Sequence, residues 1–308
     1  MFHVEHFNST NKCFKIYLFY KVHKFSPLKA TNIYLKIKDF SVTGEKFDLI
    51  YDEERDMLMT SPRPTASELS KYYESENYIS HTDSRLKLSD KLYHLVKRHM
   101  LKKKLSWINK KIPSKGKILD IGAGTGDFLL EAKKQGWKVR GVEPSTKARS
   151  LAAPKGIAMV ENCESFKSDK FDVITLWHVL EHVGDLKTQI IEIEHLLKRN
   201  GLLIIAVPNF KSYDAQYYKE YWAAFDVPRH LWHFSRQSFN KIMEGTTLKQ
   251  SDSKPLIFDS IYVSMLSEKY KTGRSNIFSA FWVGLKSNWM ARTTSEYSSI
   301  AYFFRKTR

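Results

Sequence analysis

Residues 117–126 are Lys-Ile-Leu-Asp-Ile-Gly-Ala-Gly-Thr-Gly, and this stretch decides the fold. Its apolar residues, Ile118, Leu119 and Ile121, predict a short parallel strand buried on both faces. The glycines that follow lack a Cβ, which permits a tight turn that a ligand can approach closely. A helix predicted over 126–135 then begins with its N-terminal amides facing this turn. The stretch therefore predicts the first strand-loop-helix unit of an α/β sheet.

A second predicted strand, over 138–142, ends at Glu143. A carboxylate at that place can accept hydrogen bonds from both hydroxyls of a ribose. The nicotinamide fingerprint G-x-G-x-x-G would need glycine or alanine at position 127, where this chain has Asp127. An aspartate at a helix start would also repel a pyrophosphate. The pattern therefore argues against a dinucleotide ligand. The alternative to a ligand-binding loop is a glycine turn that binds nothing.

The composition allows one large domain with an appendage, since the chain has 308 residues and is 42% hydrophobic. Its 50 Lys+Arg against 33 Asp+Glu give a net charge of +17. Such a charge can indicate a nucleic-acid or anionic-membrane partner. The lysines are scattered, however, which favours solvated faces. Only the basic stretch 97–104 is expected to offer a phosphate-facing surface.

The two cysteines, Cys13 and Cys163, are far apart and have no metal-type spacing. We therefore expect no disulfide framework and a reducing, cytoplasmic location. The sequence has no apolar run near the ~20 residues of a membrane span. The N-terminus also lacks the apolar core and cleavage site of a signal peptide.

Four parts are expected along the chain. Residues 1–30 show no steady period and are expected to be an extension, disordered in part. Residues 31–64 predict a small β-rich module with strands at 33–37 and 47–51. A helical lid and linker follow over 65–115, including a long amphipathic helix at 84–111. The remaining part, 116–308, is the predicted catalytic domain, with an acceptor-site insertion at about 210–235.

The catalytic part predicts a Rossmann-like, seven-stranded, mainly parallel sheet with helices on both faces, because strand and helix patterns alternate. The first five strands are predicted at 117–121, 138–142, 157–160, 171–176 and 201–207. The helices are predicted near 126–135, 145–153 and 185–198, with another from Ser235 to about Met243. The last two strands are predicted at 257–263 and 297–304, on either side of an aromatic helix at 277–290. That helix carries Phe278, Phe281, Trp282 and Leu285, which favour a core or partner face.

Three segments resemble class I S-adenosylmethionine (SAM) methyltransferases. Residues 117–126 resemble their motif I, D-x-G-x-G-x-G, with Glu143 as the ribose-binding acid. Residues 171–183, Phe-Asp-Val-Ile-Thr-Leu-Trp-His-Val-Leu-Glu-His-Val, resemble the F-D-x-I-x-x-x-x-V-L-E-H-V segment of a group that includes the ubiquinone-pathway O-methyltransferases. Residues 206–209, Ala-Val-Pro-Asn, are similar to the x-V-P-N of the same group. The resemblance implies methyl transfer from SAM.

The resemblance also implies where SAM binds. Asp120 would meet its cationic methionyl end, Glu143 its ribose and the loop 161–165 its adenine. The full predicted set comprises Asp120, Gly122, Ala123, Gly124, Gly126, Glu143, Pro144, Cys163, Glu164, Trp177 and His178.

The N-terminal flank resembles a narrower bacterial group with a cysteine-rich zinc ribbon ahead of the methyltransferase domain. That ribbon ends in C-x-x-C-G…T-N-P-R-P, whereas this chain has Asp52 and Arg55 at the cysteine positions and Thr-Ser-Pro-Arg-Pro at 60–64. A structural zinc site needs four thiolate or imidazole ligands. We therefore expect a degenerate ribbon without metal.

Residues 178–182, His-Val-Leu-Glu-His, match the H-x-x-E-H arrangement of zinc peptidases. In those enzymes the ligands lie within a helix, whereas here they are expected at a strand end, so no peptidase is predicted. Some relatives bind a divalent metal through E-x-x-E-H at this place. This chain has His178 first, and the alternative is that Glu181 and His182 only brace the loop. No metal is predicted, and the question stays open.

Methyl transfer depends mainly on positioning, and it needs a base only where the acceptor loses a proton. We predict His178, His230 or His233 as that base. The alternative for the segment 226–235 is a histidine-rich helix cap. Predicted acceptor contacts come from the lid, the fifth strand and the insertion, namely Tyr78, His81, Asn209, Tyr217, Trp222 and Arg229.

Three functions stay open. The first is a SAM-dependent methyltransferase that acts on an O or C atom of a small molecule. The second is an RNA-associated methyltransferase, motivated by the charge, and the third is a non-catalytic SAM-binding protein. The acceptor and the oligomeric state are not predicted.

Overall fold

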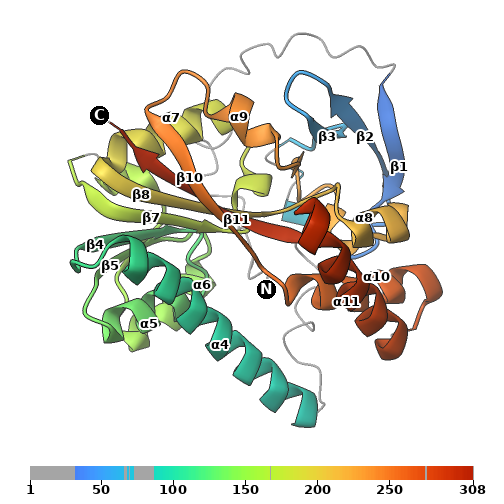
Figure 1. Cartoon of the computed structure of the whole chain (residues 1–308), viewed down its shortest axis with the longest axis horizontal. Coiled ribbons are helices and arrows are strands. Elements are labelled where there is room, and N and C mark those ends of the chain that lie inside the picture. The colour runs from blue at the N-terminus through green and yellow to red at the C-terminus, as the bar shows by residue number, and fades with distance from the viewer. Residues whose placement is uncertain are drawn as a thin grey trace.

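The computed structural model describes residues 32–65, 68, 70–72, 87–166, 168–274 and 276–307. Two sheets organise these residues, one of seven strands and one of four. Figure 1 shows the larger sheet crossing the molecule, with the smaller sheet beside it. The predicted acceptor contacts Tyr78 and His81 lie outside the described residues.

The larger sheet has the order β10-β11-β8-β7-β4-β5-β6. Its parallel part comprises β4 (Lys117–Ile121), β5 (Lys138–Val142), β6 (Met159–Val160), β7 (Phe171–Trp177) and β8 (Leu197–Pro208). The antiparallel strands β11 (Ser299–Lys306) and β10 (Leu248–Pro255) complete the edge beyond β8. This topology confirms the predicted Rossmann-like fold, and β4 and β5 have the predicted bounds.

Helices cover both faces of this sheet (Figure 1). They include α4 (Lys87–Lys111), α5 (Asp127–Lys134), α6 (Thr146–Ala152), α7 (Leu186–Leu196) and α9 (Ser238–Ile242). The side chain of Ser145 caps α6 and that of Asp185 caps α7, since each accepts a hydrogen bond from a first-turn amide. Separate apolar clusters fill the two faces, and α7 packs in one while α4 and α5 pack in the other.

The smaller sheet has the order β1-β2-β3-β9, with all its pairs antiparallel. Its strands are β1 (Ile33–Lys38), β2 (Lys46–Asp52), β3 (Met57–Ser61) and β9 (Trp232–Phe234). The sequence predicted β1 and β2 but not the other two. Because β9 comes from the insertion after β8, the N-terminal module and the insertion fold as one sheet.

The region after β9 corrects one prediction. The strand expected over 257–263 is instead a turn and the start of α10 (Asp259–Thr272), and the sixth strand is β10. The next helix, α11 (Ile277–Thr294), and the last strand, β11, lie where they were predicted. A short helix, α8 (Tyr213–Tyr218), lies beside the hairpin that α10 and α11 form (Figure 1). Within the described residues, no helix is both long and apolar enough to span a bilayer.

Candidate functional site

The glycine loop lies at the carboxyl ends of β4 and β5. The amides of Gly122 and Ala123 both donate to the carbonyl of Val142, at 2.8 and 3.0 Å, which fixes the loop to the neighbouring strand. The three glycines of the loop all have positive φ angles, of 70°, 52° and 76°. A Cβ on Gly122 would overlap the side chain of Val179, and one on Gly126 would lie 2.7 Å from Met159 Cε. The predicted requirement for glycine is therefore steric as well as conformational.

Glu143 links this loop to the next one. Its Oε2 accepts a hydrogen bond of 2.7 Å from the amide of Gly124, and its Oε1 accepts one of 2.9 Å from the amide of Ser145. The residue is buried, and the adjacent Pro144 uses its carbonyl to accept from Arg149. Glu143 therefore holds the glycine loop against the loop that follows β5.

Asp120 is buried at the end of β4, where Thr175 Oγ1 donates to its Oδ1 at 2.6 Å. Burial raises the pKa of Asp120 to about 7, against the opposing effects of the Thr175 hydrogen bond and the charge of Lys104. Its charge state therefore changes near neutral pH, which makes it responsive to a bound cation.

Lys104 is a site residue that the sequence reasoning missed. Its Nζ lies 4.1 Å from the ring centre of Trp177, at the end of β7. Burial lowers the pKa of Lys104 to about 8, while the charges of Asp259 and Asp120 act in the opposite direction. The sequence feature that could have identified Lys104 is the basic stretch 97–104, for which only a phosphate-facing surface was considered. The first residue of this stretch, Lys97, donates a hydrogen bond of 2.5 Å to Asp127.

The other predicted SAM residues meet at the same edge of the sheet. Trp177 packs edge-on against Phe128, and among the described residues its Nε1 has no hydrogen-bond partner. Cys163 is buried and Glu164 is exposed, both in the turn 163–166 that follows β6. A glycine loop, a buried acid and an indole donor without a partner among the described residues thus lie at one edge of the sheet.

His178 occupies the position just after β7 with a φ of 60°, which is uncommon for a residue other than glycine. Its Nε2 lies 3.0 Å from Asp259 Oδ2, and its Nδ1 lies 3.4 Å from Glu181 Oε1. Although burial raises the pKa of Asp259, the hydrogen bond and charge of His178 bring it down to about 2. The imidazole is thus held between two carboxyl groups.

The structure brings together two histidine segments that were predicted as separate clusters. The amide of Leu231 donates to the carbonyl of Glu181 at 2.8 Å, and the rings of His182 and His230 meet at 4.6 Å between centres. Both oxygens of Glu181 and the Nε2 of His182 are buried and have no hydrogen-bond partner among the described residues. Potential ligand atoms of Glu181, His182 and His230 all lie within 4.8 Å of one another.

The protonation of these two rings suits metal binding. The Nδ1 atoms of His182 and His230 face the carbonyls of Arg229 and Ala224, at 3.0 and 2.9 Å. A carbonyl only accepts, so each Nδ1 carries the proton and each Nε2 keeps its lone pair. Burial lowers the pKa of both rings to about 4, which keeps them neutral. Two imidazoles and one carboxylate are a donor set that a divalent transition metal accepts.

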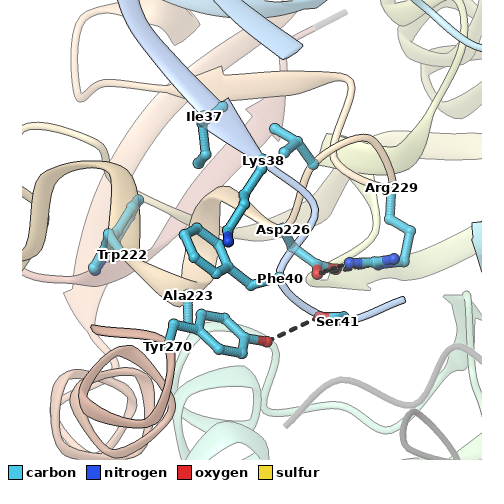
Figure 2. A pocket seen from close by; sticks show the side chains of 10 residues that line it. Ile37, Lys38, Phe40, Ser41, Trp222, Ala223, Asp226, Arg229 and Tyr270 are labelled. Atoms are coloured by element: carbon cyan, nitrogen blue, oxygen red, sulfur yellow. Dashed lines mark hydrogen bonds and ion pairs between the residues drawn. The ribbon is translucent and has the colours of Figure 1, made fainter. Parts of the chain in front are cut away.

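Arg229 was predicted to contact the acceptor, but its side chain is bonded to other parts of the protein. Its buried guanidinium donates to Asp226 at 2.6 Å, to Asp39 at 3.0 Å and to the carbonyl of Tyr72 at 2.8 Å. Figure 2 shows the pair with Asp226 beside a cavity of only about 10 Å³, too small for an acceptor. The same view shows Tyr270 bonded to Ser41, at 2.9 Å. Arg229 therefore ties the insertion to the N-terminal module.

Histidine 233, predicted as a base, also has a structural position. It lies in β9 opposite Leu58 of β3, and its Nε2 lies 3.0 Å from Thr60 Oγ1. That hydroxyl already donates to the carbonyl of His230, so the ring nitrogen of His233 is the donor. Burial lowers the pKa of His233 well below its usual value. We therefore assign His233 to the sheet rather than to catalysis.

Three other predicted acceptor contacts divide between core and surface. Trp222 is buried, and its Nε1 donates to Asp214 at 2.8 Å. Asn209 is buried too, and its amide donates to Glu296 at 2.7 Å. Tyr217 alone is exposed, and Lys271 lies 4.9 Å from its ring centre. Trp222 and Asn209 thus support the loops around the site, and only Tyr217 has a face open to a ligand.

A larger hollow, of about 370 Å³, lies at the opposite end of the sheet. Lys117, Lys138 and Phe171, at the starts of β4, β5 and β7, line it. In open parallel α/β sheets ligands bind outside the carboxyl ends of the strands. We therefore place the candidate site at the glycine loop and not in this hollow.

Comparisons with known proteins bear on the fold and family of this chain. Residues 93–249 match the profile of a family described as "Methyltransferase domain". A ubiquinone biosynthesis O-methyltransferase of Actinobacillus pleuropneumoniae is 33% identical over 107 residues, 30% of this chain and 46% of that protein. An uncharacterized protein of Methanocaldococcus jannaschii is 33% identical over 123 residues, 39% of this chain and 57% of its own length. The chain thus spans about half the length of the curated relatives it matches.

One solved structure is a SAM-dependent methyltransferase, possible histamine N-methyltransferase, from Thermotoga maritima. It is 19% identical, with a TM-score of 0.47 over 74% of this chain and 99% of that one. The family profile covers just over half of the sequence. The chain therefore belongs to the family that carries this methyltransferase domain.

Proposed function

We propose that this protein transfers a methyl group from SAM to an oxygen or carbon atom of a small acceptor. The observation that carries the proposal is the hydrogen bond between Gly124 and Glu143, which joins the glycine loop to a buried acid at the carboxyl ends of adjacent strands. An acid so placed suits a ribose, and a loop without side chains lets a nucleoside approach the backbone.

The remaining predicted contacts follow from this placement. Asp120 would face the cationic methionyl end, and the turn that contains Cys163 and Glu164 would border the adenine. The indole of Trp177 has an unused donor at the same edge. We propose these roles from the position of each residue at the ends of β4, β6 and β7.

In SAM the methyl group is bonded to a positively charged sulfonium sulfur and is therefore electrophilic. When the methyl group is transferred, the sulfur becomes a neutral thioether. For a hydroxyl acceptor, the new oxygen–methyl bond forms as the carbon–sulfur bond breaks, and the hydroxyl proton must leave. We propose that Nδ1 of His178 takes this proton, while its Nε2 donates to Asp259, which orients the ring. His230 is assigned instead to the cluster with Glu181 and His182.

A divalent metal, where bound, would be held by Glu181, His182 and His230 and would polarise an acceptor oxygen. Its place beside His178 suits that role, since Nδ1 of His178 lies 3.4 Å from Glu181. The rest of the proposed mechanism does not depend on this metal.

We keep the four-part organisation as a proposal, with the module at 31–64 a degenerate ribbon. Supporting this, Arg55 Nη1 bonds Asp52 Oδ2 at 2.7 Å, so an ion pair joins the two positions that hold cysteine in the resembling group. A cytoplasmic location is likewise proposed. The RNA-associated alternative loses support because Lys97 of the basic stretch pairs with Asp127.

Isothermal titration with SAM and with its demethylated product, S-adenosylhomocysteine (SAH), tests the proposal. We expect both to bind, and Glu143→Ala to weaken binding roughly 10- to 100-fold through loss of a charged acceptor. Glu131→Ala on α5 is the control and should bind as the unchanged protein does. Absence of binding by the folded protein would refute the assignment, while binding without turnover over a panel of acceptors would favour the non-catalytic alternative.

A further inference from the structure

The hairpin of α10 and α11 carries an aromatic surface that the other described residues leave exposed. Both helices lie between β10 and β11 in sequence, and in Figure 1 they stand at one side of the molecule next to α8. We define the aromatic face as the outward residues of α11, which are Ile277, Phe278, Phe281, Trp282, Leu285 and Trp289.

The buried face of α11 is made of small residues. Ala280, Val283, Gly284, Ser287 and Ala291 are buried. A Cβ on Gly284 would lie 2.8 Å from the Cα of Ile261, so the two helices approach too closely there for any side chain. Small residues thus pack inward, and the largest side chains of the helix are left outside.

The outward exposure is large. Phe278 is 83% exposed, Trp282 69% and Trp289 67%. The six residues of the aromatic face recur at helical spacing and therefore form one continuous stripe. Apolar patches of this kind on a folded protein mark an interaction surface.

The charges around the stripe indicate the partner. From Lys269 to Ser295 the sequence has five Lys or Arg residues and no Asp or Glu. All five, Lys269, Lys271, Arg274, Lys286 and Arg292, are exposed. Two acids border this stretch. Glu268 is buried and accepts hydrogen bonds from Ser279 and Tyr218, and Glu296 lies 3.9 Å from the guanidinium of Arg236. Over this stretch the hairpin therefore presents tryptophan and phenylalanine together with exposed charges that are all cationic.

We propose that the aromatic face of α11 docks on the surface of an anionic lipid bilayer. Tryptophan is favoured at the membrane–water boundary, and flanking Lys and Arg are attracted to anionic headgroups. A second copy of this chain fits less well, because apposed hairpins would bring two cationic surfaces together. The contact is with the surface, since no described helix is able to cross the bilayer.

Co-sedimentation with vesicles tests the docking. The full chain should pellet with vesicles of phosphatidylcholine and phosphatidylglycerol at least roughly tenfold more strongly than with phosphatidylcholine alone, and added salt should weaken the binding. Failure of the folded protein to bind the anionic vesicles overturns the proposal.

Matched variants separate the apolar and the charged contributions. The triple change Phe278→Ser, Trp282→Ser and Trp289→Ser should abolish binding, whereas Leu151→Ser with Ile191→Ser, exposed apolar residues of α6 and α7, should not. Likewise Lys269→Gln, Lys286→Gln and Arg292→Gln should weaken binding at least roughly tenfold, and Lys134→Gln, Lys187→Gln and Lys249→Gln, exposed elsewhere, should have little effect.

Circular dichroism should report unchanged folding in all these variants, because each altered side chain points outward. Binding that survives the triple aromatic change overturns the assignment of the face. If analytical ultracentrifugation without vesicles shows a dimer, and the triple aromatic variant is a monomer, the face would instead be assigned to self-association.

Discussion

The Nε2 of His178 lies 3.0 Å from Oδ2 of Asp259, although 81 residues separate the two in sequence. The contact joins the end of β7, where methyl transfer is proposed, to the first residue of α10. Asp259 is therefore the point at which the C-terminal hairpin reaches the site. Its side chain is only 19% exposed, so water screens this hydrogen bond less than one on the surface.

The change Asp259→Asn is expected to lower the free energy of unfolding by about 1–3 kcal/mol at neutral pH, since a charged hydrogen bond is lost. The folded-state pKa of Asp259 is depressed to about 2. Its stabilisation is therefore present above the ordinary aspartate pKa and is lost as the pH falls toward 2. Urea unfolding of both proteins across acidic pH should show the difference shrinking. The control is Asp169→Asn, in an exposed pair with Lys117.

A difference between Asp259→Asn and the unchanged protein that stays constant from neutral to acidic pH would contradict a contribution from the ionised carboxylate of Asp259. It would mean that Asp259 acts through packing alone.

Gly122 and Gly44 provide a matched test of the loop. Their φ angles are 70° and 71°, but a Cβ on Gly44 meets no atom within 4 Å, whereas one on Gly122 overlaps Val179. Gly44→Ala should cost about 1–2 kcal/mol from backbone strain alone. Gly122→Ala should cost a further 1–3 kcal/mol or so through overpacking, and it should weaken SAH binding. Thermal unfolding and calorimetric titration measure both effects.

The double variant Gly122→Ala with Val179→Ala should recover part of the stability that Gly122→Ala loses, because the overlapping methyl groups are gone. Equal losses in Gly44→Ala and Gly122→Ala, with SAH binding intact, would show that the steric account of this loop is wrong.

The affinity for SAH is expected to depend on pH through Asp120. Burial raises the pKa of this carboxyl to about 7, so it is mostly neutral below that pH and anionic above it. The cationic methionyl end favours the anion, and we expect SAH to bind roughly tenfold more tightly at about pH 8 than at about pH 6. Titration of Asp120→Asn should show weaker binding that no longer depends on pH.

Asp172→Asn is the control for this titration, because Asp172 lies at the other end of β7, beside Lys117 and Lys198. A pH dependence that persists in Asp120→Asn would place the titrating group elsewhere.

The strands of the large sheet could be predicted from the sequence where their side chains are buried and could not where they are exposed. The strand β4 is buried and mainly apolar, and β5 alternates buried residues with the exposed Lys138 and Arg140. Both lie next to glycine turns, and their bounds matched the prediction. The edge strand β10 has only Leu248 buried, and its polar sequence gives no strand signal. The adjacent residues 257–263 are richer in β-branched and aromatic side chains but form a helix. There Ser260 and Ser264 are buried, and Ser260 donates to the carbonyl of Gly284.

The candidate site shows the same division. The loop and Glu143 were predictable because local spacing defines them. The pairing of β9 with β3, which uses His233, joins segments more than 170 residues apart. The segment 226–235 was predicted to be part of the active site because of its residue types alone. The tertiary contacts of Arg229 and His233 show that both side chains hold parts of the fold together. Lys104 and Asp259 were missed because each reaches the site from a helix outside the recognised motifs.

The cluster of Glu181, His182 and His230 makes a final prediction about metal binding. Added Zn²⁺ or Mn²⁺ should raise the melting temperature of the metal-free protein, because a metal that binds only the folded state stabilises it by mass action. The shift should disappear in His230→Ala, since one of three ligands is lost. His195→Ala, an exposed histidine on α7, should retain it. The stabilisation should also fade as the pH falls below about 4, the pKa of both rings, because protons then compete for the imidazoles. No shift with either metal, or the same shift in both variants, would leave Glu181 and His182 as supports for the loop after β7.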